Sequence, residues 1–100
     1  MAHILIIDDD EATRYSLSRM VSRMSHTATC AATLEEGVAK ASAGDIDVVF
    51  LDVRMPDGNG IEMLPTFRQA PSSPEIIIIT GYGDPEGAER QAQQGRRGAP

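Results

Sequence analysis

Short, largely apolar runs alternate along this chain with longer stretches in which apolar residues recur every three or four positions. The runs at residues 3–7, 47–51 and 76–80 are rich in β-branched side chains, which predicts strands buried on both faces of a sheet. The longer stretches predict amphipathic helices, because apolar residues at that spacing share one face. This alternation predicts an α/β fold with a doubly wound parallel sheet.

The stretch after the first strand predicts a helix that begins at Asp10, its N-cap, and runs to about Met24. Four apolar residues at helical spacing are expected to face the sheet: Leu17, Met20, Val21 and Met24. The next segment, residues 27–32, is compatible with a strand but lacks bulky side chains, which favours an edge of the sheet.

The same periodicity predicts three further helices, at residues 35–43, 61–69 and 85–94. Gly44 is expected to end the first of these. Pro65 lies in the second and predicts a short or bent helix, since proline lacks the backbone N–H that an interior position donates. The segment between Met55 and Gly60 is rich in turn-forming residues and is expected to be a loop, with Asp57 as a turn residue.

Composition narrows the functional classes. One hundred residues suffice for one domain with a modest core, and a net charge of −6 argues against a nucleic-acid-binding surface. No apolar run approaches the length of a membrane-spanning helix, so a cytoplasmic location is expected. The single cysteine, Cys30, offers no disulfide, and His3 and His26 have no partner at metal-ligand spacing.

Acidic residues follow two of the predicted strands. Asp8 and Asp9 come directly after the first, and Asp52 ends the apolar run at residues 48–51. The carboxyl ends of neighbouring parallel strands share one edge of the sheet, so these three carboxylates are expected to lie close together. Their mutual repulsion favours a bound cation, and Mg²⁺ takes carboxylates, water and phosphate as ligands. Asp52 considered alone would equally suit a residue that caps the following turn.

Three motifs in this order resemble the receiver domain of two-component response regulators. They are Asp8-Asp9, the loop Asp52-Val-Arg-Met-Pro-Asp-Gly-Asn-Gly60, and the strand ending in Thr80 with Gly-Tyr-Gly-Asp after it. The last two are most similar to receivers of the nitrogen-regulator type. The resemblance extends from about Ile4 to about Gln94 and implies a flavodoxin-like doubly wound parallel sheet.

The resemblance also implies a function. Asp52 would be the phosphoacceptor, receiving a phosphoryl group from a partner sensor histidine kinase. Asp8, Asp9 and Asp52, together with the backbone carbonyl of Arg54, would hold Mg²⁺, with Asp8 acting through water. Thr80 would contact the phosphoryl group and switch on phosphorylation. Such a domain assists its own phosphotransfer and is not a turnover enzyme.

The carboxyl-terminal segment departs from the family pattern. Receivers continue with a fifth strand, a lysine before a proline, and a fifth helix, whereas residues 93–100 contain no apolar strand and Lys40 is the only lysine. A receiver domain over residues 1–94 without the last strand and helix is therefore expected, with a disordered tail at 95–100. The strand at 76–80 would then have a free edge, which predicts self-association, and Tyr15 or Met24 would be exposed to water.

Two other functions remain as alternatives. The chain could be a degenerate receiver that acts only as a protein-interaction module, independent of phosphorylation. It could also be a phosphohydrolase of the haloacid dehalogenase type, which likewise begins from an aspartate after the first strand. That family expects Gly-Thr after its Asp-x-Asp motif, whereas Glu11 and Ala12 follow here. A phosphorylation assay would separate these possibilities.

Overall fold

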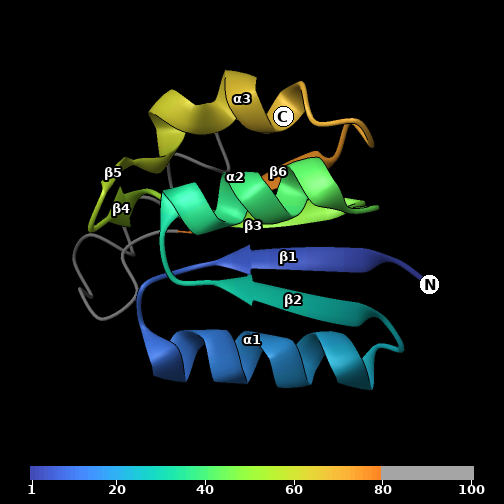
Figure 1. Cartoon of the computed structure of the whole chain (residues 1–100). Helices are drawn as coiled ribbons and strands as arrows, with labels where there is room; N and C mark the ends of the chain where they lie inside the picture. Colours follow the sequence, from blue (N-terminus) through green and yellow to red (C-terminus); the bar gives the residue numbers. More distant parts are fainter. Residues whose placement is uncertain (80–100) are drawn as a thin grey trace, which may run out of the picture.

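A four-stranded parallel sheet forms the centre of the computed structural model, which describes residues 1–79. The strand order is β2–β1–β3–β6, with bounds β1 (His3–Ile7), β2 (Thr27–Ala31), β3 (Val48–Asp52) and β6 (Glu75–Ile79). Three helices flank the sheet: α1 (Glu11–Arg23), α2 (Leu34–Ala43) and α3 (Leu64–Arg68). Figure 1 shows α1 on one side of the sheet and α2 and α3 on the other. The predicted α/β architecture is confirmed, as is the edge position of β2.

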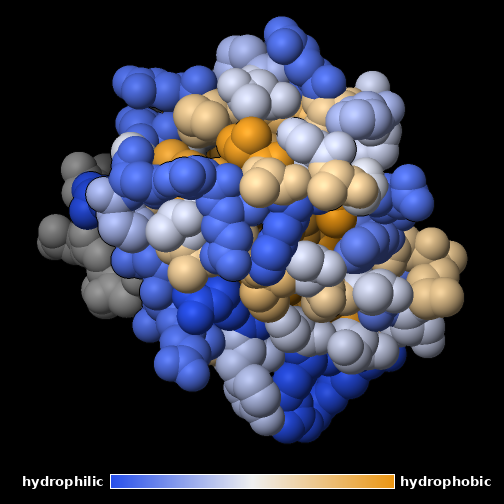
Figure 2. Space-filling view, in the orientation of Figure 1, coloured by the Kyte–Doolittle hydropathy of each residue, from blue (hydrophilic) through white to orange (hydrophobic). Residues whose placement is uncertain are grey.

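The core has two parts because successive side chains of a strand point to opposite faces of the sheet. Leu5 and Ile7 of β1 belong to the larger cluster, which includes Phe67 of α3 and is covered by α2 and α3. Ile4 and Ile6 of the same strand belong to the smaller cluster beneath α1. Figure 2 shows apolar colour in the seam between α2 and α3, and a hydrophilic surface on the outer side of α1.

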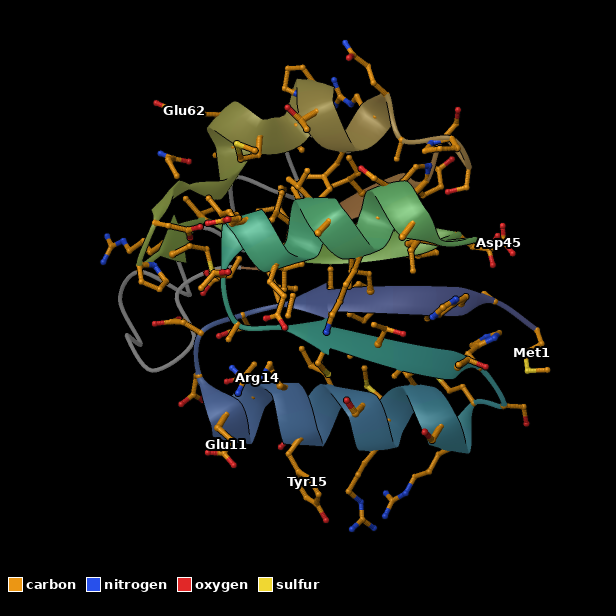
Figure 3. The ribbon with its side chains drawn as sticks, viewed as in Figure 1. Met1, Glu11, Arg14, Tyr15, Asp45 and Glu62 are labelled. Carbon is orange, nitrogen blue, oxygen red and sulfur yellow. The ribbon has the colours of Figure 1, made fainter. Side chains whose placement is uncertain are left out.

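Helix α1 begins as predicted, but the face that it buries is narrower than its apolar periodicity predicts. Asp10 is its N-cap and accepts a hydrogen bond of 2.9 Å from the backbone N–H of Thr13. The prediction that Met20 and Met24 face the sheet is wrong, because these side chains are 46% and 60% exposed. The buried line instead follows four-residue steps through Thr13, the partly buried Leu17 and Val21. The predicted exposure of Tyr15 is confirmed, and Figure 3 shows its side chain pointing away from the sheet.

The segment after β3 is more ordered than the loop that we expected. Strands β4 (Arg54–Met55) and β5 (Gly58–Asn59) form a small antiparallel hairpin, and a 3-10 helix (Gly60–Met63) leads from it into α3. Pro65 lies in the first turn of α3, where a missing N–H removes no helical hydrogen bond. The predicted short helix is therefore confirmed.

Part of the prediction lies beyond the described residues. Thr80, the helix at 85–94 and the tail at 95–100 are outside residues 1–79, so the predictions made for them stay predictions. Within residues 1–79, β6 pairs only with β3, and no helix there is long and apolar enough to cross a membrane.

Candidate functional site

Three carboxylates meet at the carboxyl edge of the sheet. Asp8 follows β1, and Asp52 is the last residue of β3. The two strands pair in parallel with Ile7 opposite Leu51, so the next residue of each strand reaches the same edge. Asp8, Asp9 and Asp52 each offer an oxygen, and these oxygens lie within 4.8 Å of one another. Within residues 1–79 this is the one cluster of its kind, and the predicted convergence of the three aspartates is confirmed.

The carboxylate of Asp8 is buried. Only 3% of the residue is exposed, and its Oδ1 accepts a hydrogen bond of 2.9 Å from the backbone N–H of Asp10. Burial raises the pKa of Asp8, and the negative charges of Asp9 and Asp10 act in the same direction. The Asp10 N–H and the Arg14 guanidinium oppose the shift without cancelling it. A buried acid with two acidic neighbours is a position that a cation would stabilise.

Asp52 is the most strongly perturbed acid of the cluster. Loss of hydration and the nearby charges of Asp8 and Asp9 raise its pKa to about 6, against the opposing effect of the Arg54 and Val53 backbone N–H groups. Its side chain is partly exposed, so a reactant from solvent can approach it. The arrangement therefore combines a partly desolvated carboxylate with access from one side.

The loop between β1 and α1 is fixed by side-chain hydrogen bonds among near neighbours and by a backbone bond of 3.1 Å from Asp8 N–H to the carbonyl of Ala31. The carboxylate of Asp10 accepts from both the backbone N–H and the hydroxyl of Thr13, at 2.9 and 2.6 Å. Arg14 Nη1 donates to the backbone carbonyl of Asp8 at 2.8 Å, and Figure 3 shows this side chain on the sheet side of α1. The backbone that carries Asp8 and Asp9 is thus held from both ends of the loop.

The hairpin after Asp52 is fixed in another way. Gly60 N–H donates to the carbonyl of Val53 at 2.7 Å, which closes the hairpin directly behind Asp52. A Cβ at Gly60 would collide with the Asp52 carbonyl oxygen, so this close approach requires glycine. Met55 is only 8% exposed and packs into the larger core cluster. Arg54, whose carbonyl was a candidate ligand, is the exposed residue of β4, two positions beyond Asp52.

Asp57 has a contact that sequence reasoning missed. Its two carboxylate oxygens accept hydrogen bonds of 2.9 Å each from the backbone N–H groups of Leu34 and Glu35, at the start of α2. These hydrogen bonds lower the pKa of Asp57 because they favour its charged form. The partners lie 23 and 22 residues earlier in the chain, so the local pattern around Asp57, which indicates a turn residue, contains no signal for them.

The single lysine does not belong to this site. Lys40 Nζ lies 3.3 Å from Glu36 Oε2 in the same helix and donates to the backbone carbonyl of Cys30 at 2.5 Å. These contacts engage the Lys40 ammonium on α2 and β2. His3 and His26 bond to Thr29 and to the backbone of Ala2, and neither joins the acidic cluster.

Comparison with known proteins agrees with this geometry. The family model described as the response regulator receiver domain matches residues 4–99. The photosynthetic apparatus regulatory protein RegA of Rhodovulum sulfidophilum is 34% identical over 80 residues, covering 80% of this chain and 44% of RegA. The chain therefore spans less than half the length of that regulator.

Two solved structures resemble the fold closely. A CheY-like response regulator receiver protein from Methanospirillum hungatei superimposes with a TM-score of 0.77 at 30% identity, covering 82% of this chain and 66% of that protein. The response regulator TrrA of Thermotoga maritima, solved in complex with Mg²⁺-BeF, gives a TM-score of 0.75 at 30% identity, covering 82% and 71% respectively. Both similarities agree with the flavodoxin-like sheet predicted from the sequence.

Proposed function

This chain belongs to the response regulator receiver family of two-component systems, and from this membership we propose that Asp52 accepts a phosphoryl group from a partner histidine kinase in the cytoplasm. We propose further that the reaction depends on Mg²⁺ held by Asp8, Asp9, Asp52 and the backbone carbonyl of Arg54, with Asp8 acting through water. The single observation that carries this proposal is the convergence of three carboxylate oxygens within 4.8 Å at the end of a buried parallel strand.

The donor set suits the metal. Carboxylate oxygens are the ligands that Mg²⁺ prefers, and two oxygens on opposite sides of the ion lie about 4.2 Å apart. A separation of at most 4.8 Å therefore needs only small side-chain rotations to suit the ion. The TrrA structure was solved in complex with Mg²⁺-BeF, which supports Mg²⁺ as the metal proposed for this chain. When bound, the metal supplies the positive charge that lets an anionic carboxylate meet an anionic phosphoryl group.

Each residue then has a distinct task. An Asp52 oxygen attacks phosphorus while the bond from phosphorus to the kinase histidine breaks, and that bonding pair returns to the imidazole nitrogen. Asp8 is buried and fixed, so it sets the inner side of the site, whereas exposed Asp9 faces the approaching partner. Thr80 lies outside the described residues. By the family pattern, its hydroxyl would contact the phosphoryl group and change position on phosphorylation.

Phosphorylation by a small donor tests the proposal. The full chain is incubated with acetyl phosphate and Mg²⁺, and the modified residue is located by mass spectrometry. We expect one acid-stable, base-labile label on Asp52 that requires the metal and disappears in Asp52→Asn. A label on serine, threonine or histidine, or undiminished labelling of Asp52→Asn, would contradict the proposal.

A second function is favoured by the contacts of Lys40. This sole lysine bonds to Glu36 and Cys30 on α2 and β2, so no lysine reaches the acidic cluster. The chain could therefore act as a phosphorylation-independent interaction module. The acetyl phosphate experiment separates the two functions, because the module would retain its fold and take up no label.

Self-association through β6 stays a prediction. Within residues 1–79 this strand pairs only with β3, and its Ile77 and Ile78 are 49% and 39% exposed. An apolar strand with an unpaired edge favours pairing with another chain. Light scattering coupled to size exclusion measures it: we expect a mass that rises with concentration. A concentration-independent monomer would contradict this prediction.

A further inference from the structure

The side chain of Asp57 joins the β4–β5 hairpin to helix α2 by hydrogen bonds. Asp57 lies between the two strands of the hairpin, and both of its carboxylate oxygens bond to α2, one to Leu34 N–H and one to Glu35 N–H. A carboxylate at a helix N-terminus also interacts favourably with the helix dipole. The contact therefore joins the segment that follows Asp52 to an element that lies before Asp52 in the chain.

The remainder of the hairpin is held by further contacts at its base and along one strand. Gly60 N–H bonds to the Val53 carbonyl at the base, and the buried Met55 anchors one strand in the core. Gly58, next to Asp57, has φ of +147°, and a Cβ placed there would lie 3.4 Å from Leu34 Cδ1. The hairpin thus packs against the start of α2 at the same place where Asp57 bonds to it.

We propose that Asp57 is a positioning residue, which fastens the hairpin to α2 and thereby holds the Asp52 and Arg54 backbone in the geometry that metal binding requires. This inference rests on the proposed function, because it concerns the same Mg²⁺ site. Asp57 itself does not contact the acidic cluster and acts through the hairpin. Outer partners that orient metal ligands commonly change affinity about 10- to 100-fold when they are removed.

The alternative is that Asp57 only caps the N-terminus of α2 and has no effect on the metal site. The helix has another cap that provides a matched comparison: Thr33 Oγ1 accepts from the backbone N–H of Glu36 at 3.1 Å. Thr33 stabilises the same helical turn but forms no hydrogen bond to the hairpin. Removal of either cap should weaken α2, whereas only removal of Asp57 should disturb the metal site.

The experiment compares Asp57→Ala with Thr33→Ala in the full chain. Mg²⁺ is titrated calorimetrically against each folded variant, and hydrogen exchange of the Gly60 amide is measured without metal. In Asp57→Ala we expect Mg²⁺ affinity to fall about tenfold or more, and Gly60 exchange to accelerate by a similar factor. In Thr33→Ala we expect less than about a twofold change in either quantity. Asp57→Asn keeps one acceptor oxygen and should fall between the wild type and Asp57→Ala.

The outcomes separate this inference from the proposed function. Wild-type protein that binds Mg²⁺, with Asp57→Ala and Thr33→Ala equally affected or equally unaffected, would overturn the positioning role and leave the metal site intact. A wild type that binds no Mg²⁺ would overturn the proposed function and this inference together. If Asp57→Ala does not fold, Asp57→Asn decides, and its affinity must lie below that of Thr33→Ala for the inference to hold.

Discussion

The two segments that bring carboxylates to the site are built on opposite principles. The side-chain hydrogen bonds of the β1–α1 loop join residues no more than six positions apart, from Asp8 to Arg14. A backbone hydrogen bond from Asp8 N–H to the carbonyl of Ala31 adds one long-range contact. The hairpin after Asp52 depends on Asp57, whose partners are 22 and 23 residues away, and on packing against the core. The side-chain contacts of the β1–α1 loop are therefore local in sequence, whereas the Asp57 contact on the other side of the site forms only when α2 and the hairpin are packed together.

The largest expected effect concerns the protonation of Asp52, the acid on the hairpin side, whose pKa is raised more strongly than that of Asp8 on the β1–α1 side. Asp52 has a folded-state pKa of about 6 against an ordinary value of 3.8, so the folded state binds this proton more tightly than the unfolded state does. In the metal-free protein, the contribution of Asp52 to the free energy of unfolding should therefore be largest below about pH 4. It should lose up to about 3 kcal/mol as pH rises through about 6, at 1.36 kcal/mol per unit of pKa shift.

Urea unfolding in EDTA between pH 4 and 7.5 measures this loss. Asp52→Asn should flatten the profile but keep a smaller slope of the same sign, because the pKa of Asp8 is raised as well. At pH 7.5, Mg²⁺ at one hundred times its dissociation constant should restore about 2.7 kcal/mol. If the difference in free energy of unfolding between wild type and Asp52→Asn does not change between pH 4 and 7.5, burial and the neighbouring carboxylates do not raise the pKa of Asp52.

Substitution at Gly60 should break the hairpin side alone. In Gly60→Ala the new methyl group meets the Asp52 carbonyl oxygen, so we expect a loss of about 1–3 kcal/mol in the free energy of unfolding. Mg²⁺ affinity should fall with it, because the backbone of Asp52 must shift. Gly44→Ala is the control: a Cβ there meets only the Lys40 carbonyl at an ordinary 3.5 Å. Equal effects of the two substitutions, by chemical denaturation, would refute the close-approach argument.

A smaller effect is expected on the β1–α1 side. Arg14→Gln removes the bond from Nη1 to the Asp8 carbonyl, which should lower the free energy of unfolding by about 0.5–1.5 kcal/mol. Arg19→Gln is the control, since Arg19 is exposed and, among residues 1–79, its side chain forms a hydrogen bond only with the hydroxyl of exposed Tyr15. Its effect should stay within about 0.5 kcal/mol. Faster amide exchange at Gly60 in Arg14→Gln would show that the two sides are not independent.

The same contrast explains which parts of the site could be predicted from sequence. The proximity of Asp8, Asp9 and Asp52 could be predicted from the sequence, because these residues follow or end apolar strands and neighbouring parallel strands end at one edge of the sheet. Asp10 was recognisable as an N-cap, because its partner Thr13 is three residues away. The role of Asp57 could not be predicted, since its contacts require α2 and the hairpin to be already packed.

The errors in the fold have a physical cause of the same kind. Helical periodicity indicates which side of α1 is apolar, but how wide a stripe becomes buried depends on the surface that the sheet presents. The sheet covers Leu17 and Val21 and leaves Met20 and Met24 largely in water. Likewise, glycine and proline after Asp52 indicate turns, while the β4–β5 pairing depends on the close approach at Gly60.

The parallel pairing of β1 with β3 has a kinetic consequence. Paired residues of the two strands, such as Ile4 and Val48, lie 44 positions apart in the chain, so the strands can meet only after a long loop has closed. The carboxylates of Asp9 and Asp52 repel one another only once that closure has occurred. If the site forms on the native side of the folding barrier, their repulsion speeds unfolding and leaves the refolding rate unchanged. Mg²⁺ would then slow unfolding, which lengthens the lifetime of the folded chain, without accelerating folding.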